Sequence, residues 1–230
     1  MAKKTVHADD RMVAVEEALS KTEQFIEKYQ KVLIIVVAAI VLIILAFYAY
    51  KKLYVAPMEK EALSQMFVAE RYFEIDSLNR ALYGDGNNLG FLDIIDEYGV
   101  SNAGNLARYY AGISFLKLGQ YEDAIDYLKA FNKDDKIVSA MALGGIGDAY
   151  MELDEPESAV KYYMKAAGHN INNFSTPLFW LKAGWTYEIL GEYDKAVELY
   201  NKIYKEYPRS SEAREIEKYI ARATALGEKK

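Results

Sequence analysis

The side chains best suited to chemistry are few and scattered in this sequence of 230 residues. There is no cysteine, which excludes disulfides, thiolate zinc sites and cysteine nucleophiles. The two histidines, His7 and His169, are too few for a histidine-based metal centre. Adjacent acids such as Asp134 and Asp135 fall where we expect a solvated turn, and no phosphate-binding loop, nucleophile elbow or dinucleotide fingerprint occurs. We therefore predict a protein with no catalytic residues, no metal and no cofactor.

Charge and composition restrict the class of partner. The net charge of −6 argues against nucleic-acid binding, which needs clustered lysine and arginine. Residues 1–31 hold equal numbers of basic and acidic side chains and residues 32–50 hold none, so the rest of the chain carries the whole excess. A hydrophobic share of 52% with only four prolines favours an ordered, turn-poor chain. We expect an acidic folded domain after residue 50.

Residues 32–50 form an uninterrupted apolar segment of the type that crosses membranes. As a helix it would span about 28 Å, close to the ~30 Å hydrocarbon core of a bilayer. Lys31 and Lys51-Lys52 flank it, and Tyr48, Tyr50 and Tyr54 suit the interfacial aromatic belt. The preceding region is too long and the apolar run too extended for a cleaved signal peptide. We predict an uncleaved single transmembrane anchor; the alternative is a buried core helix.

The charges beside the anchor do not fix its orientation. Lysines within about twenty residues are equal in number on the two sides, and only the whole tail tilts the balance toward a cytoplasmic N-terminus. Apolar residues in that tail, from Met12 to Tyr29, recur at helical spacing among charged ones. The tail is therefore predicted to be an amphipathic helix. It would lie on the membrane surface, pack against a partner's helix, or be a frayed extension with no partner.

Three segments after residue 104 repeat one helix–turn–helix pattern. Gly112, Gly147 and Gly184 are separated by 35 and 37 residues, and so are three alanines of the following helices. Small residues at such positions let two antiparallel helices approach closely, while aromatic rings fill the remaining space. The motifs are Ala111-Gly112-x-x-Phe115 with Leu118-Gly119-x-Tyr121-x-x-Ala124, Ile146-Gly147-x-x-Tyr150 with Ala159-x-x-x-Tyr163, and Trp180-x-x-Ala183-Gly184-x-x-Tyr187 with Leu190-Gly191-x-Tyr193-x-x-Ala196.

These motifs resemble the tetratricopeptide repeat (TPR) family, over about residues 105–208. The second unit departs from the family pattern at its turn, where Asp154-Glu155-Pro156 replaces Gly-x-Tyr. The resemblance implies an all-α protein in which helix hairpins stack into a right-handed superhelix with a concave face. A non-repeating helical bundle is the alternative. The expected segments are 1–31 (tail), 32–50 (transmembrane helix), 51–100 (linker helix and degenerate TPR-like hairpin), 101–210 (three repeats) and 211–230 (capping helix and tail).

Within residues 51–100 we expect two helices separated by a loop. The first would cover 58–76, with Pro57 setting its start, and the second, short helix would cover 89–97. The loop between them, 84–88, is rich in glycine and asparagine and lacks the further acids of a calcium loop.

The resemblance also implies where a ligand binds, because the inner helix of each TPR hairpin lines the concave groove. The implied set mixes apolar, aromatic and acidic side chains, which suits helix-in-groove or extended apolar peptide binding. It offers none of the basic clamp by which some members of the family hold a terminal carboxylate. Alternatively, neighbouring helices cover several of these positions. The protein-binding residues so implied are Leu106, Tyr109, Ile113, Leu116, Met141, Asp148, Met151, Leu178, Leu181, Trp185 and Glu188.

An anchor followed by a TPR solenoid is similar to the family of ancillary subunits of the SecYEG translocon. That resemblance implies a bacterial inner-membrane protein with a cytoplasmic N-terminus and a periplasmic TPR domain. Its partners would be translocon subunits, a membrane-anchored prolyl-isomerase chaperone and exported clients, with neither nucleic acid nor a small-molecule substrate. Two alternatives remain: a scaffold for outer-membrane or division assembly, and a cytosol-facing organelle import receptor.

Overall fold

A computed structural model describes the backbone of residues 6–132 and 134–229, and the side chains from Lys28 onward apart from Lys133 and Lys230. The chain forms two compact units, Met1–Val55 and Ala56–Lys230. Throughout the described residues the regular structure is helical, without a strand. The predicted all-α fold class is confirmed.

The first unit is one long helix, α1 (Val6–Tyr50), followed by a single π-helical turn, η1 (Lys51–Val55). Its most apolar 18-residue window has a mean hydropathy of 3.3, and none of that window is buried. Lys51 and Lys52 lie 5.5 and 5.9 Å from the ring centroids of Phe47 and Tyr48. The helix is thus long and apolar enough to cross a membrane, with cations and aromatic rings together at its C-terminal end. The side chains of the predicted amphipathic tail before Lys28 lie outside the described residues.

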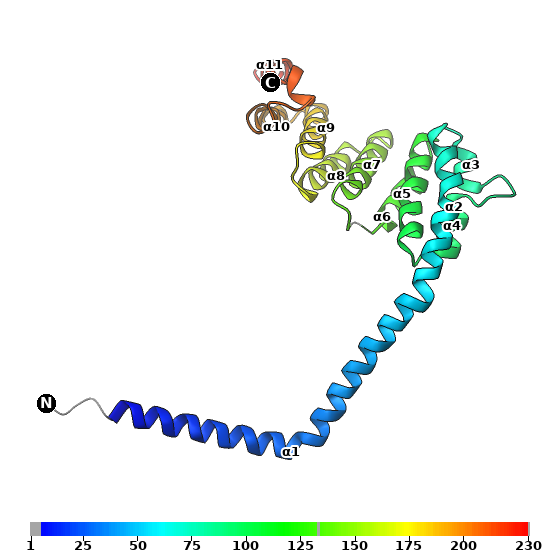
Figure 1. Cartoon of the computed structure of the whole chain (residues 1–230). Coiled ribbons are helices and arrows are strands. Elements are labelled where there is room, and N and C mark those ends of the chain that lie inside the picture. Colours follow the sequence, from blue (N-terminus) through cyan, green and yellow to red (C-terminus); the bar gives the residue numbers. More distant parts are fainter. Residues whose placement is uncertain (1–5, 133, 230) are drawn as a thin grey trace. The chain divides into compact units, whose positions relative to one another are not determined.

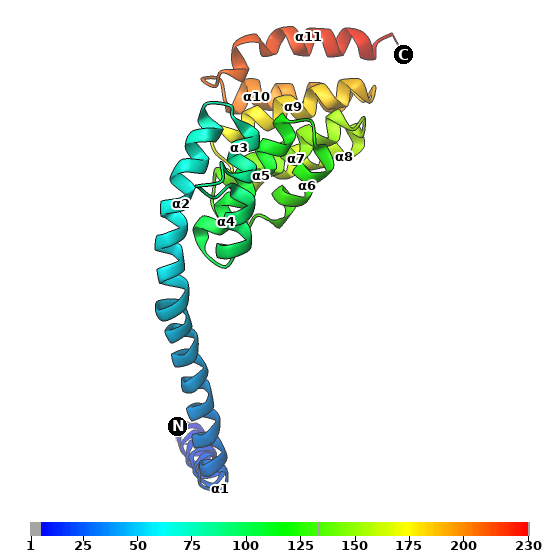
Figure 2. The same cartoon turned by 90° about the vertical axis from the view of Figure 1, so that its right-hand side faces the viewer.

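The second unit is a stack of antiparallel helices (Figures 1 and 2). It begins with α2 (Ala56–Glu74), α3 (Leu78–Tyr83) and α4 (Phe91–Tyr98). Three hairpins follow: α5 (Asn102–Lys117) with α6 (Tyr121–Ala130), α7 (Val138–Glu152) with α8 (Pro156–His169), and α9 (Ser175–Ile189) with α10 (Tyr193–Glu206). The 3-10 turn η2 (Glu212–Glu215) and α11 (Ile216–Gly227) end it. From α4 to α11, each α-helix packs against the next α-helix in the chain.

The repeated glycines lie where the two helices of a hairpin cross. A Cβ placed on Gly147 would lie 2.6 Å from Tyr163, and one on Gly184 would lie 2.2 Å from Tyr200. The rings occupy the space that a side chain would need, and Tyr200 is fully buried. The sequence spacing is therefore a packing requirement, since protein interiors tolerate almost no overlap.

The turns that join the two helices within each hairpin share one backbone conformation. Asp76, Gly119, Asp154 and Gly191 have positive φ angles of 57, 77, 58 and 70°. In each turn, the amide of this residue donates to the carbonyl three residues back, and the next amide donates to the carbonyl five residues back. These are the left-handed bonds that commonly end a helix. The Asp154 turn thus departs from the TPR sequence pattern while keeping the same backbone, and Pro156 begins α8.

The same turn after α2 relates the first three helices to the hairpins that follow. Helix α2 corresponds to the first helix of a hairpin, and α3 with α4 takes the place of its second. The sequence did not predict α3, whose Leu78, Ala81 and Leu82 are buried against α2. Between α3 and α4, Asp85 accepts hydrogen bonds from two loop amides, the Asn88 side chain and the Tyr72 hydroxyl.

Candidate protein-binding face

The first helices of the hairpins form the inner layer of the stack. Over the described residues, α5 contacts α7 and α7 contacts α9, whereas the outer helices α6, α8 and α10 make at most marginal contact with one another. Helices that crowd together on one side while their partners spread on the other produce a curved array with a concave inner side. We call the exposed side of α5, α7 and α9 the inner face. The predicted contact residues all lie on these three helices.

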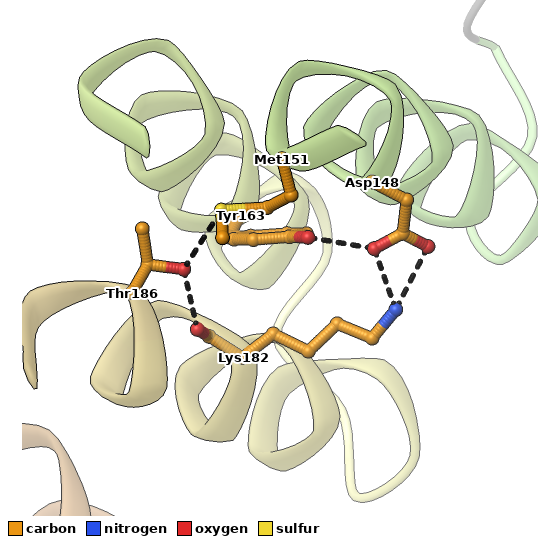
Figure 3. Close-up of polar contacts among 5 residues, drawn as sticks. All are labelled: Asp148, Met151, Tyr163, Lys182 and Thr186. Carbon is orange, nitrogen blue, oxygen red and sulfur yellow. Dashed lines mark hydrogen bonds and ion pairs between the residues drawn. The ribbon is translucent and has the colours of Figure 1, made fainter. Parts of the chain in front are cut away.

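A polar cluster crosses the inner face between α7 and α9 (Figure 3). Asp148 on α7 receives two hydrogen bonds from Lys182 Nζ on α9, at 2.7 and 2.8 Å. The buried Tyr163 on α8 donates its hydroxyl hydrogen to the same carboxylate at 2.7 Å. Beside it, Thr186 donates its hydroxyl to the carbonyl of Lys182 and also approaches the sulfur of Met151. One carboxylate therefore joins three helices of two successive hairpins.

A second cluster of the same kind joins α9, α10 and α11. The carboxylate of Glu188 receives hydrogen bonds from Arg222 Nε and a terminal guanidinium nitrogen, both at 2.9 Å. Tyr200 on α10 donates its hydroxyl hydrogen to Glu188 at 2.6 Å. Such bidentate arginine–carboxylate pairs are among the stronger charge-assisted contacts in proteins. The capping helix α11 is thus fastened to the last hairpin through the inner-face residue Glu188.

Both tyrosines have shifted acidities for the same physical reason. Burial raises the pKa of Tyr163, and the negative charge of Asp148 raises it further. Burial likewise raises the pKa of Tyr200, together with its hydrogen bond to Glu188. The hydrogen bond between Arg222 and Glu188 also raises the pKa of the Arg222 guanidinium. The hydroxyls therefore remain hydrogen-bond donors well above neutral pH.

Sequence reasoning missed four members of these clusters: Tyr163, Lys182, Tyr200 and Arg222. A usable signal was present, because each acid precedes its cation by 34 residues, about one repeat. That spacing places acid and cation on equivalent helices of adjacent units. The inner face therefore does contain basic residues, although its carboxylates already engage them. The prediction that the inner face lacks a basic clamp for a partner's terminal carboxylate concerned the predicted contact residues, and neither Lys182 nor Arg222 is one of them.

A shallow pocket of about 370 Å³ lies on the inner face near the C-terminal ends of α5 and α7. Its apolar wall is formed by Leu116 and Met151, two of the predicted contact residues. The polar wall comprises Tyr121, Asp148, Glu152 and Tyr163. A pocket with a flexible thioether, an aliphatic side chain and carboxylates suits an apolar side chain flanked by a basic or amide group.

The remaining predicted residues are less accessible than a fully open groove would make them. Tyr109 packs on Phe131 with 5.9 Å between the ring centroids, and Ile113 lies against α7 at Gly145. Each predicted residue other than Leu181 and Trp185 is half-buried. Those half-buried against the core include Leu106, Met141 and Leu178.

Two residues on α9 differ from the rest. Leu181 is only 8% exposed and packs in the cluster with Ala196, Tyr200 and Ile216. It supports the junction with α10 and α11, and little of its side chain is exposed for contact with a partner. Trp185 is 39% exposed and meets Tyr219 of α11 edge to face, at 5.7 Å. The capping helix thus covers part of the inner face at its C-terminal end and leaves Trp185 accessible.

Comparisons with known proteins identify the repeats. The tetratricopeptide repeat family model matches residues 109–173 and, in a second overlapping position, residues 145–211. Residues 109–211 therefore carry tetratricopeptide repeats, as the sequence predicted.

One solved structure shares the fold, and two others are similar to a lesser degree. A single-substitution variant of a Podosopora anserina protein described as a kinesin light chain with nearly identical TPR-like repeats superposes with a TM-score of 0.57 and 13% identity, over 75% of this chain and 89% of that chain. Two crystal structures of MamA give TM-scores of 0.49 and 0.41, with 21 and 27% identity, over 73 and 60% of this chain and 88 and 90% of theirs. No curated protein matches. The chain therefore has a TPR-like solenoid fold, which typically serves as a non-catalytic scaffold for protein–protein interaction.

Proposed function

We propose that this protein is a membrane-tethered scaffold that binds other proteins on the inner face of its solenoid. One observation carries the proposal: an unburied apolar helix, long enough to span a bilayer, precedes a TPR solenoid with an open pocket between successive inner helices. A spanning helix confines the solenoid to the membrane surface, which raises its effective concentration toward partners held there. Modest affinity in the pocket is then sufficient for capture.

The contact set that we propose is centred on Leu116, Met151 and Trp185. Leu116 and Met151 form the apolar wall of the pocket, and Trp185 is the exposed aromatic residue on the next inner helix. Aromatic and flexible apolar side chains dominate the binding energy of many protein interfaces. An apolar or amphipathic segment of a partner, lying across α5, α7 and α9, would contact all three.

At a finer level, we propose that the chain is an ancillary component of the Sec protein-export translocon. Its N-terminus would be cytoplasmic and its solenoid periplasmic, at the bacterial inner membrane. There the inner face would bind a membrane-anchored prolyl-isomerase chaperone or an exported client emerging from the channel. The support is architectural: one anchor followed directly by a short TPR solenoid.

Site-specific photocrosslinking tests the binding proposal. A photoreactive residue is placed at Met151 or Trp185, with a matched control at Lys161, which is exposed on the outer helix α8. Crosslinks that form from the inner positions but not from Lys161 support the inner face as the binding surface. Equal yields from all three positions would contradict it. Recovery of channel subunits or of a prolyl isomerase supports the translocon role, whereas outer-membrane or division assembly proteins would favour the alternative scaffold.

Topology distinguishes the organelle import receptor from both envelope roles. Because the chain has no cysteine, Ser64→Cys introduces a single exposed thiol on α2. A membrane-impermeant maleimide should label it in cells whose outer membrane has been permeabilised, and lysis should not raise the labelling. Labelling only after lysis would place the solenoid on the cytosolic side and contradict the periplasmic proposal.

A further inference from the structure

Contacts between successive turns connect the points at which the chain passes from one hairpin to the next. Glu59, in the first turn of α2, accepts hydrogen bonds from the first two amides of α5. Further along, Asn105 and Asn132 exchange hydrogen bonds, and the ring of His169 lies 3.3 Å from the carbonyl of Asp135. Asn173 then lines a pocket together with residues 206–210. We call this continuous side, from α2 to residue 210, the loop edge.

One turn of the loop edge, residues 170–174, holds apolar side chains outward. Ile171 is 74% exposed and Phe174 is 58% exposed. The side chain of Asn172 fixes the turn: its carbonyl oxygen accepts from the amides of Phe174 and Ser175, and its amide nitrogen donates to the carbonyl of Asn170 and the hydroxyl of Ser175. The Asn172 side chain thus bonds within the turn and holds its backbone in one conformation. The turn presents two large apolar side chains, Ile171 and Phe174, to the outside.

The loop edge is also the side at which the chain enters the second unit. Helix α2 begins there at Ala56, and only the five residues of η1 lie between Ala56 and the end of the apolar helix. A chain of five residues holds its two ends within about 18 Å. When α1 spans a bilayer, the start of α2 therefore stays within reach of the lipid surface.

We propose that the loop edge rests on the surface of the membrane that α1 spans, with Ile171 and Phe174 entering the boundary between headgroups and acyl chains. This inference rests on the tether of the proposed function. The segment 170–174 contains no charged residue, so its insertion carries no charge-desolvation cost. Charged side chains elsewhere on the edge, including Asp134, Asp135, Lys136, Glu206 and Arg209, remain at headgroup level.

Single-site fluorescence in vesicles tests the proposal with the full chain. Phe174→Cys, labelled with an environment-sensitive nitrobenzoxadiazole dye, is reconstituted into phosphatidylcholine vesicles. Its matched control is Ile189→Cys, at the opposite end of α9, where the native residue is 64% exposed. A helix of that length separates the two sites by about 22 Å. A label at Ile40→Cys, within the apolar helix, reports separately on whether the tether enters the bilayer.

Membrane contact predicts a blue-shifted emission at position 174, loss of most iodide quenching, and strong quenching by lipids that carry a nitroxide near the headgroup. Position 189 should keep the emission and iodide quenching that it has in detergent. If position 40 is lipid-quenched while position 174 stays open to iodide, the tether stands and the contact of the loop edge is refuted. If position 40 is not lipid-quenched, the tether itself is wrong. Protection of position 174 in native membranes but not in pure lipid vesicles would identify a protein partner instead and overturn the proposal.

Discussion

At the scale of single residues, the most informative position is Tyr163, which lies on α8 behind the inner face and is bonded to the inner-face residue Asp148. It is 3% exposed and donates a hydrogen bond to Asp148, whereas Tyr162, next to it on α8, is half-buried and stacks on Tyr150. Tyr163→Phe should lower the free energy of unfolding by about 1–2 kcal/mol, because the carboxylate loses a donor. Tyr162→Phe should change it by less than about 0.5 kcal/mol. Urea denaturation of both variants checks this, and equal effects would show that the Asp148 cluster contributes no stability.

The two buried tyrosines also predict how stability depends on pH. Their pKa values are raised above the ordinary value of 10, so their contribution is complete below pH 10. Above that pH the unfolded chain releases protons that the folded chain keeps, and the free energy of unfolding therefore falls as pH rises. The double variant Tyr163→Phe with Tyr200→Phe should show a shallower decline above about pH 10. An identical slope in the two proteins would contradict the linkage.

At this scale the sequence predicted which residues lie on the inner helices better than it predicted which of them bond to one another. Side chains such as Leu116, Met151 and Trp185 could be placed on inner helices because their positions follow from the repeat. The role of Leu181 could not, because its burial depends on how α10 and α11 close over it. Lys182 and Arg222 were missed for a related reason: their partners lie on the preceding unit, and the motif describes one unit at a time.

At the scale of helices and turns, the crossing glycines set how closely two helices approach. Gly184→Ala would place a Cβ 2.2 Å from the buried ring of Tyr200, so it should destabilise the protein by about 1–3 kcal/mol. Gly168→Ala, near the end of α8, meets no atom within 4 Å. It should be neutral or stabilising by up to about 1 kcal/mol, since alanine is the better helix former. Thermal unfolding by circular dichroism distinguishes the two, and similar melting temperatures would argue against close crossing at Gly184.

At the turn that contains Asp154 we predict a substitution that raises stability. Its φ of 58° is unfavourable for a residue with a side chain, whereas the equivalent turns at Gly119 and Gly191 use glycine. Asp154→Gly should therefore raise the free energy of unfolding by up to about 1 kcal/mol. Gly191→Ala, the converse change at φ 70°, should lower it by a similar amount. A loss of stability in Asp154→Gly would mean that the aspartate side chain makes a compensating contact.

The hairpins themselves follow closely from sequence, because glycine spacing, alanine spacing and the αL turns are local requirements. The first three helices do not. Residues 78–83 form α3, which a short apolar pattern cannot distinguish from a loop, and its stability comes from burial of Leu82 in the core that it shares with α2, α4 and α5. The turn at Asp76 resembles the turns at Gly119, Asp154 and Gly191 only in its backbone conformation, so the sequence alone did not indicate that a helix follows it.

At the scale of the whole molecule, the apolar helix should determine where the protein resides. Val36→Arg combined with Ile40→Arg puts two charges in the middle of the segment, each costing about 2.5–3.5 kcal/mol on insertion scales. We expect the native chain to remain in the membrane pellet after alkaline carbonate extraction, and the double variant to be largely released. The conservative pair Val36→Leu with Ile40→Leu controls for the substitutions themselves. Release of the native chain would contradict a spanning helix.

The class of the whole molecule could be predicted from sequence, since the apolar run and the repeat are long-range patterns with few alternatives. Its partners could not, because a TPR face is defined by whichever side chains a family member places there. Orientation in the membrane is likewise undetermined by residue type, as the flanking lysines are balanced.

The junctions between hairpins are of two chemical kinds. Where α5 and α6 meet α7, Ile113 and Leu128 pack on Gly145, and hydrogen bonds join Tyr121 to Glu152 and Lys129 to Tyr150. The next two junctions rely on the Asp148–Lys182 and Glu188–Arg222 pairs. Because a solenoid owes its cohesion to nearest-neighbour contacts, raising the ionic strength should weaken the two junctions that contain these ion pairs more than the junction of α5 and α6 with α7. A cell that concentrates its solutes would then soften the C-terminal end of this solenoid the most.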